Sequence, residues 1–163
     1  MTASLSRGRR VARAAAALVA AGTLGLSGCA NYATLDSYTP AAGVNVDAPT
    51  VKIRNLLIIA DASGAGKLSG ALVGSESDTL TALAGIPIKL DNAEGEALTF
   101  SKVSVPIVAG RLTKLDEAGI TVSGADLQPG LNADLVLTFT KIGDVTVTVP
   151  VVSSDHPDFS SEG

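Results

Sequence analysis

The sequence predicts a single all-β domain, a sandwich of antiparallel strands. Apolar and polar residues alternate with the two-residue period of half-buried strands, most regularly over 135–140 and 145–151. Strand-like runs are short and separated by Gly, Pro and Asn, and no long stretch after residue 30 has helical periodicity. Short strands with frequent turn residues favour two packed sheets.

The individual strands can be placed by their patterns. Val51–Leu56 alternates apolar and polar residues, and 57–60 continues as a buried run. Leu68–Val73 predicts a second strand after the flexible turn 63–66. Further strand-like runs span 80–90, 97–108 and 119–123, with a turn at 91–96. Pro106 marks an edge strand or a bulge, because proline cannot donate a hydrogen bond to a ladder.

The C-terminal hairpin has the clearest pattern. Leu135, Leu137 and Phe139 alternate with Val136 and two threonines. Four valines at alternate positions follow the turn 141–144: Val145, Val147, Val149 and Val151. This pattern predicts an antiparallel hairpin with one apolar face. Gln128-Pro129-Gly130, just before it, predicts a type II turn, since glycine tolerates the positive φ that the turn needs.

The first 28 residues resemble a secretory signal peptide. Four arginines and no acid precede a run of 13 apolar or small residues, 14–26, which is too short to span a bilayer as a helix. The residues Leu26, Ser27, Gly28 and Cys29 then resemble a lipobox, in which small residues give a signal peptidase access to the bond before the cysteine. We expect cleavage after Gly28, a diacylglycerol thioether on Cys29, and acylation of its new amino group.

Alternatives for this segment stay open. Cys29 could be an ordinary buried cysteine, or the apolar run could be retained uncleaved in the membrane, which its short length disfavours. The pair Arg9-Arg10 hints at twin-arginine export. Ala12 lacks the bulky apolar side chain expected after such a pair, which favours the general secretory route.

Composition divides the rest of the chain. Residues 29–49 are small and polar, with two prolines, and predict a lipidated cysteine on a flexible tether; the alternative is a loosely packed first strand. Residues 50–153 are predicted to form the sandwich, and 154–163 a disordered polar tail. Removal of residues 1–28 from the 163-residue chain leaves 135 residues, enough for one domain with a substantial core.

The chain is acidic once the first 28 residues are removed. These residues contain four of the 12 Lys and Arg and none of the 16 Asp and Glu, so eight bases and 16 acids remain and the net charge is −8. Such a surface is expected to repel nucleic acid and anionic head groups rather than attract them. Cys29 is the only cysteine, so no disulfide is expected, and the covalent lipid is the only prosthetic group predicted.

The residues that common catalytic sites need are missing. His156 is the single histidine and lies in the predicted tail, which excludes a triad or a His-pair metal site inside the predicted sandwich. No serine stands in a Gly-x-Ser-x-Gly motif, and carboxylates such as Asp116 and Glu117 leave only a glycosidase open. Phe100 and Phe139 are interpreted as core residues rather than a stacking platform. We therefore predict no enzyme.

Two loops superficially match ligand-binding motifs. Residues 61–68 (DASGAGKL) lack the first glycine and the hydroxyl residue of a phosphate-binding loop, so a plain hairpin turn is expected. Asp91, Asn92, Glu94 and Glu96 could supply oxygen ligands, but they lack the spacing of a calcium loop. Neither loop is predicted to be a specific site.

The segment 51–152 resembles the periplasmic copper chaperone family PCuAC, in its actinobacterial lipoprotein branch. The resemblance rests on the opening strand VKIRNLLIIA with its Gly-rich turn, on Gly119–Ser123 (GITVS), and on the ending LQPGLNADLVLTFTKIGDVTVTVPVV. It implies an immunoglobulin- or cupredoxin-like β-sandwich, in agreement with the alternation of apolar residues.

The same resemblance implies a copper site whose ligands are missing here. Family members hold Cu(I) with His and Met, because imidazole and thioether groups suit that ion. The family's late His-x-Met pair falls at Thr121 and Ser123. Its early His and Met should lie in 97–112, which contains neither, and the only methionine of the chain is Met1. No residue is therefore predicted as a metal ligand.

These observations predict a non-catalytic, lipid-anchored binding module on the outer face of the cell membrane. Its partner would be an envelope protein or an apolar ligand, and not nucleic acid. The alternative is a copper metallochaperone of the PCuAC type with a non-standard site, such as carboxylates together with His156. An envelope hydrolase is the third and weakest interpretation.

Overall fold

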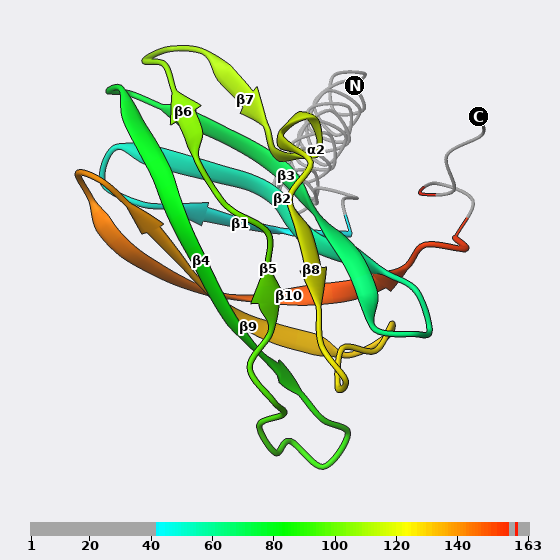
Figure 1. The fold of residues 1–163 in the computed structure, drawn as a ribbon. Coiled ribbons are helices and arrows are strands. Elements are labelled where there is room, and N and C mark those ends of the chain that lie inside the picture. The colour runs from blue at the N-terminus through cyan, green and yellow to red at the C-terminus, as the bar shows by residue number, and fades with distance from the viewer. Residues whose placement is uncertain (1–41, 157–158, 160–163) are drawn as a thin grey trace, which may run out of the picture. The chain divides into compact units, whose positions relative to one another are not determined.

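The computed structural model of this chain describes residues 42–156 and residue 159, which form a β protein with one short helix (Figure 1). The elements in chain order are β1 (Val44–Asp47), β2 (Val51–Ala60), β3 (Ala65–Gly74), β4 (Asp78–Ile88), β5 (Thr99–Phe100), β6 (Val105–Ile107), β7 (Leu112–Lys114), α2 (Leu115–Ala118), β8 (Thr121–Ser123), β9 (Asn132–Phe139) and β10 (Gly143–Ser153). The long strands form two groups in the chain, β2–β4 and β9–β10, and five short elements lie between these groups.

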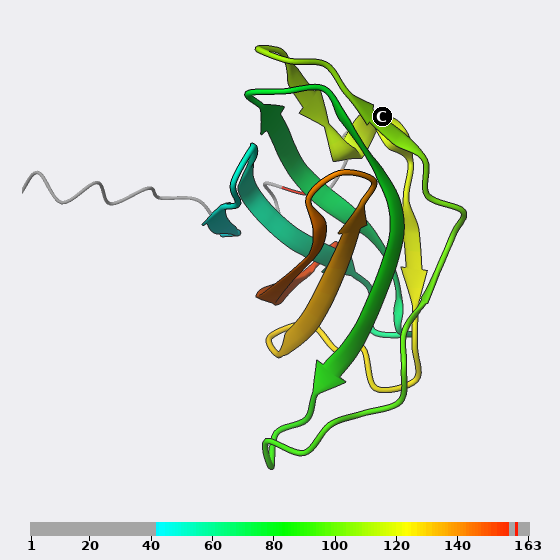
Figure 2. The same ribbon diagram turned by 90° about the vertical axis from the view of Figure 1, so that its left-hand side faces the viewer.

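The strands form two sheets that share β10. The order of hydrogen-bonded neighbours is β5-β8-β3-β2-β10-β9-β4-β6, with β1 added to β2 and β7 added to β3. The first sheet contains β1, β2, β3, β5, β7 and β8, and the second contains β4, β6 and β9. The sheets curl around a common core (Figures 1 and 2), which confirms the predicted sandwich.

Strand β10 changes sheets near its end. From Gly143 to Pro150 it pairs antiparallel with β9, and from Val151 to Ser153 it pairs with β2. The second pairing is parallel, so the prediction of a wholly antiparallel sandwich was wrong for this one pair. The cause is topological, because β10 must run alongside β2 in the same direction to close the two sheets.

The core consists of the apolar residues that alternate along the long strands. Leu135, Leu137 and Phe139 of β9 are buried, whereas the residues between them are partly exposed. On β10, Val147 is buried opposite Leu135, and Val149 is buried opposite Ala133. This arrangement confirms the predicted C-terminal hairpin and its apolar face, and it shows that Phe139 is a core residue.

A buried carboxylate fastens the β9–β10 turn to the start of β4. Asp78 is 6% exposed, and its carboxylate accepts hydrogen bonds from the backbone N–H groups of Lys141 at 3.0 Å and Ile142 at 3.4 Å. It also accepts from the N–H of Thr79 at 2.7 Å. Backbone donors therefore satisfy this carboxylate in place of water.

The turn before the hairpin is also as predicted. The N–H of Leu131 donates to the carbonyl of Gln128 at 3.3 Å, and Gly130 has a φ of 90°. A positive φ at the third residue of a turn closed in this way defines type II. Gly130 is thus required by its backbone conformation rather than by lack of space, since no atom lies within 4 Å of the position its Cβ would take.

The tether prediction for 29–49 was wrong at its end, because Val44–Asp47 forms β1 against β2. Asn55, at a β-bulge with φ of 50°, accepts a hydrogen bond from the N–H of Gly43 at 2.8 Å. Its own N–H donates to the side chain of Asn45 at 2.9 Å. These contacts depend on the bulge, which the alternation pattern of 51–60 does not reveal.

The run 97–108 is two strands instead of the single strand predicted. Thr99–Phe100 (β5) pairs with β8 in the first sheet, and Val105–Ile107 (β6) pairs with β4 in the second. The residues between them cross from one sheet to the other. Pro106 lies in β6, at the end of the strand order, which confirms its predicted edge position.

The predicted tail begins with an ordered turn, so the prediction of disorder was wrong for its first residues. The N–H of Ser154 donates to the carbonyl of Ala60 at 2.9 Å, which continues the contact of β10 with β2. The N–H of Phe159 donates to the carbonyl of His156 at 2.8 Å, and their rings lie 5.8 Å apart. Backbone pairing at the end of β10 therefore extends past Ser153.

Candidate functional site

The predicted lipidation motif lies outside the described residues. Leu26, Ser27, Gly28 and Cys29 all precede residue 42, where the description begins, so cleavage and lipidation stay predictions. In the part of the chain that the structure describes, no helix is long and apolar enough to cross a membrane. The candidate site must therefore be sought on the sandwich.

The positions that the resemblance assigns to copper ligands lie on β8. Thr121 and Ser123 are exposed there, on either side of the buried Val122. Strand β5 pairs beside them, with Thr99 opposite Ser123, and the hydroxyl of Ser101 accepts a hydrogen bond from the N–H of Thr121 at 3.1 Å. On the other side of β8, Lys67 of β3 lies opposite Thr121. Hydroxyl oxygens are poor ligands for Cu(I), which prefers thiolate, thioether and imidazole, so these residues do not fit that ion.

Carboxylates of the sandwich do not gather into a metal-binding group. Within residues 42–156 and 159, no three His, Cys, Asp or Glu side chains come together in a group that could hold a metal ion. On α2, Asp116 accepts a hydrogen bond from the N–H of Gly70 at 3.5 Å, and Glu117 forms an ion pair with Lys114 at 3.5 Å. Asp91 and Asp126 line one hollow together, and each accepts a hydrogen bond from a backbone N–H.

The turn 61–64, part of the segment that superficially matches a phosphate-binding loop, joins β2 to β3 as predicted. One oxygen of Asp61 accepts hydrogen bonds from the hydroxyl of Ser63 at 2.6 Å, from the N–H of Ser63 at 2.8 Å and from the N–H of Ala65 at 3.2 Å. The hydrogen bond from the Ser63 hydroxyl, followed by those from the backbone, lowers the pKa of Asp61. The carboxylate thus holds its own turn.

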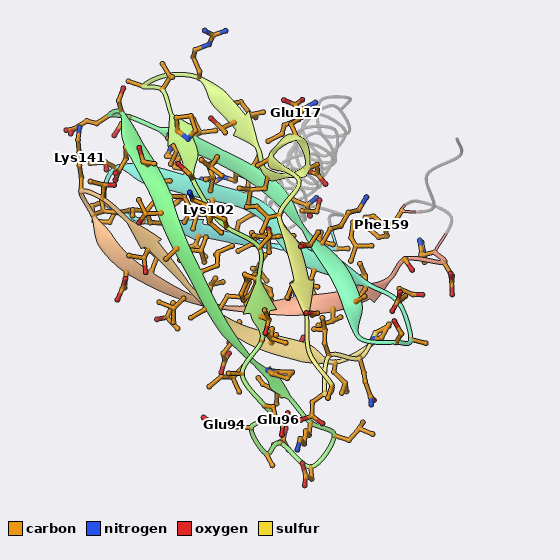
Figure 3. All side chains as sticks on the ribbon, viewed as in Figure 1. Glu94, Glu96, Lys102, Glu117, Lys141 and Phe159 are labelled. Carbon is orange, nitrogen blue, oxygen red and sulfur yellow. The ribbon has the colours of Figure 1, made fainter. Side chains whose placement is uncertain are left out.

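The acidic loop between β4 and β5 is bound in a similar way. Asp91 accepts from the N–H of Ala93 at 3.0 Å, and Asp126 accepts from the N–H of Glu96 at 3.0 Å. That backbone hydrogen bond is the main reason why the pKa of Asp126 is lowered, with Lys89 at 3.3 Å adding to it. Figure 3 shows Glu94 and Glu96 on this loop, at the opposite end of the molecule from Glu117.

The most distinctive surface feature is a hollow where the crossing segment meets β7 and α2. We call it the β6–β7 groove; it has a volume of about 480 Å³. Its lining includes Lys102, Ser104, Pro106, Leu112, Lys114 and Glu117. Leu112 is 59% exposed, and Lys102 makes no ion pair within the described residues. The groove thus combines apolar surface with an uncompensated ammonium group.

Two further hollows lie elsewhere on the sandwich. One, of about 300 Å³, lies beside the acidic loop and includes Lys89, Leu90 and Asp126. The other, of about 530 Å³, lies where the β2–β3 turn meets the C-terminal segment, and includes Asp61 and Phe159. In both, the carboxylate accepts hydrogen bonds from its own surroundings. The larger hollow also includes Lys67, which like Lys102 makes no ion pair within the described residues, but no exposed large apolar side chain lines it.

Comparison with known proteins identifies relatives of the fold. No family model and no curated protein matches the chain. Among solved structures, the copper-bound PCuAC domain from PmoF2 superposes with a TM-score of 0.51 at 18% identity, over 68% of this chain and 98% of that domain. The apo PCuAC domain from PmoF1 (TM-score 0.49, 18% identity, 68% and 99% covered) and the apo PmoF2 PCuAC domain (0.46, 18%, 69% and 97%) are more distant in TM-score. The chain has a PCuAC-like sandwich fold.

Sequence analysis missed the β6–β7 groove, although the sequence contained a sign of it. From Ala97 to Lys114 the chain has three bases, Lys102, Arg111 and Lys114, and no acid. The other described residues have five bases and 13 acids. A local reversal of charge in an acidic domain could have drawn attention to this segment.

Proposed function

We propose that this chain is a lipid-anchored, extracytoplasmic interaction module of the cell envelope, without catalytic activity. The observation that carries the proposal is the sequence Leu26-Ser27-Gly28-Cys29, directly after a 13-residue apolar run. The first strand of the sandwich begins at Val44, so about 15 residues separate the cysteine from the folded domain. A cysteine placed for lipidation, a short linker and a folded domain are the parts that a lipoprotein needs.

The chemistry of the sandwich supports a binding role over catalysis. A general acid or base near neutral pH requires a carboxyl pKa that is raised, or a histidine in a cleft. At Asp61 and Asp126, hydrogen bonds within surface loops lower the carboxyl pKa instead of raising it. His156 lies after the last strand and stacks against Phe159 at an angle of 48°.

Labelling with a palmitate analogue in the producing cells tests the anchor. We expect the label on the native chain, with the amino terminus of the processed protein at Cys29. The change Cys29→Ser should abolish labelling, whereas Gly28→Ala, which keeps a small residue before the cysteine, should retain it. An unlabelled native chain that still contains residues 1–28 would contradict the proposal.

Copper carriage is the second candidate, because the sandwich resembles a PCuAC domain that binds copper. The test is a titration of residues 31–163 with Cu(I) and Cu(II), with His156→Ala as the control variant. Stoichiometric tight binding that His156→Ala abolishes would establish copper carriage at a non-standard site. Tight binding that survives His156→Ala would place the copper on other residues. Binding by neither chain above the weak background of an acidic surface would eliminate copper carriage, and the interaction module would remain.

A further inference from the structure

The exposed apolar residues of the sandwich are concentrated near the β6–β7 loop. Val108 is 50% exposed and Leu112 is 59% exposed, and the only other large apolar side chain so exposed among the described residues is Leu90, on the acidic loop. Val108 and Leu112 flank the tip of the loop, and Leu112 also lines the β6–β7 groove. Two apolar side chains are therefore exposed to solvent within the segment from Ala97 to Lys114, which contains no acid.

Hydrogen bonds hold the loop in one conformation. The N–H of Arg111 donates to the carbonyl of Val108 at 3.0 Å, and Gly110 has a φ of 71°, which closes a tight turn. The N–H of Gly110 donates to the carbonyl of Gly74 at 2.8 Å, and that of Ala109 donates to the hydroxyl of Ser77 at 3.2 Å. The exposure of Val108 and Leu112 is thus built into the fold.

Basic side chains surround these two residues. Lys102 and Lys114 line the same groove as Leu112, and Arg111 lies in the tip between Val108 and Leu112. Lys52 lies on the same side of the first sheet as Leu112. It is opposite Val73 of β3, and Val73 is in turn opposite Leu112 of β7. We call Lys52, Lys102, Val108, Arg111, Leu112 and Lys114 the β6–β7 face.

The acids nearest to this face do not cancel its charge. Glu117 pairs with Lys114. Glu76 lies in the turn after β3, beside Ser77, whose hydroxyl accepts from the N–H of Ala109. Asp47 lies opposite Lys52 across β1 and β2 and pairs with Arg54, so the face carries four bases against three acids. Over the remaining described residues, acids outnumber bases by 10 to four. A negatively charged surface therefore attracts this face and repels the rest of the domain, which gives the domain one preferred orientation.

We propose that the β6–β7 face docks on the anionic headgroups of the membrane that carries the chain. Each Lys or Arg near such a surface contributes to binding, and exposed Val and Leu side chains enter the boundary between headgroups and acyl chains. The inference rests on the proposed lipid anchor, since a linker of about 15 residues, at up to roughly 3.5 Å per residue, keeps the sandwich within about 50 Å of the bilayer.

Vesicle binding by an unlipidated chain tests the docking. The chain 29–163 with Cys29→Ser contains every strand and the whole core. It is sedimented with vesicles of phosphatidylcholine alone or mixed with phosphatidylglycerol. We expect binding only to the mixed vesicles, weakening as ionic strength rises. Lys102→Gln with Arg111→Gln should weaken that binding roughly tenfold or more, and Val108→Ser with Leu112→Ser should weaken it as well.

Matched controls come from the other end of the domain. Lys67→Gln with Lys89→Gln makes the same change in net charge, and Leu90→Ser removes an apolar side chain that is 86% exposed. Both should leave vesicle binding within about twofold of the unchanged chain, because their sites face away from the membrane. Unchanged circular dichroism verifies that each variant is folded.

Two results would overturn the docking proposal. One is binding that does not distinguish neutral from anionic vesicles, either because both are bound equally or because neither is bound. The absence of binding to both is the result expected if the face binds an acidic envelope protein. The other is an equal loss in the control variants. Because this assay uses chain without lipid, it is independent of the palmitate labelling. If the native chain takes up the palmitate label but the unlipidated chain does not bind vesicles, the docking proposal alone is refuted. If the native chain is not labelled, the lipid anchor is refuted.

Discussion

The β9–β10 hairpin and the segment 97–123 are both built from strands, yet different contacts hold them in place. In the hairpin, eight successive residue pairs join two strands without a shift in register. In the segment 97–123, β5, β6, β7 and β8 have only two or three residues each, and they join different neighbours in two sheets. Both regions contribute buried residues to the core, such as Leu137 of the hairpin and Ile107 of the segment. The difference is that the segment also carries exposed apolar side chains, Val108 and Leu112, beside its buried ones.

Truncation of one leucine in each region should show most clearly how a buried position of the hairpin differs from an exposed position of the segment. Leu137 is fully buried in β9, so Leu137→Ala should lower the free energy of unfolding by about 2–5 kcal/mol. Leu112→Ala, at an exposed position of β7, should change it by less than about 0.5 kcal/mol. Urea denaturation measures both. Similar losses from the two changes would contradict the exposed position of Leu112 in the folded protein.

The carboxylate that fastens the hairpin should have the next largest effect. Asp78→Ala leaves the N–H groups of Lys141 and Ile142 without their acceptor and should cost about 1–3 kcal/mol in urea denaturation. Asp144, in the same turn, is exposed and accepts from the hydroxyl of Thr138 at 2.7 Å. Asp144→Ala is the control, with an expected loss below about 1 kcal/mol. Equal losses would mean that burial of Asp78 contributes nothing.

Replacement of Asp61, in the β2–β3 turn, should have the smallest effect on the free energy of unfolding, and this effect should depend on pH. Its pKa is lowered in the folded protein, first by the Ser63 hydroxyl and then by backbone N–H groups. A depressed carboxyl pKa stabilises the fold above the unfolded value of about 3.9, and that contribution is lost as the pH falls through the folded pKa. Asp61→Ala should therefore be less stable than the native chain at pH 7 and converge with it below about pH 4.

Thermal unfolding at a series of pH values checks this, with Asp155→Ala as the exposed control. Asp155 lies in the turn after β10, where its backbone N–H, and not its carboxylate, makes the hydrogen bond to Ser153. The control should follow the native curve at every pH. A constant difference between Asp61→Ala and the native chain, from pH 7 down to acid, would contradict the role given to ionised Asp61.

The parts of the fold that could be predicted are those whose pattern is local. Alternation over 135–140 and 145–151 reports directly which side chains face the core, and the hairpin follows from it. Strand β1 could not be predicted in the same way, since it depends on the left-handed conformation of Asn55 and on contacts between residues distant in sequence. The division of 97–108 depends on which sheet lies beside each half, and alternation does not encode that.

The candidate site was harder to predict than the fold. The resemblance directed attention to Thr121 and Ser123, which lie on an exposed strip of hydroxyl groups. The groove instead combines Lys102 with Leu112 and Lys114, three residues brought together by a sheet crossing and a strand pairing. Only the missing acids between Ala97 and Lys114 were visible in the sequence, and charge alone does not indicate which residues share a surface.

The change of sheet within β10 has a consequence for the order in which the domain can assemble. The chain is synthesised from its amino terminus. Strand β2 therefore pairs with β10, as in Ile58 opposite Val151, only after nearly the whole domain has been synthesised. Until then no hydrogen-bonded strand pair joins the two sheets. Completion of the sandwich therefore depends on a pairing between residues far apart in sequence, which is slow to form, and the final strand sets a late step in folding.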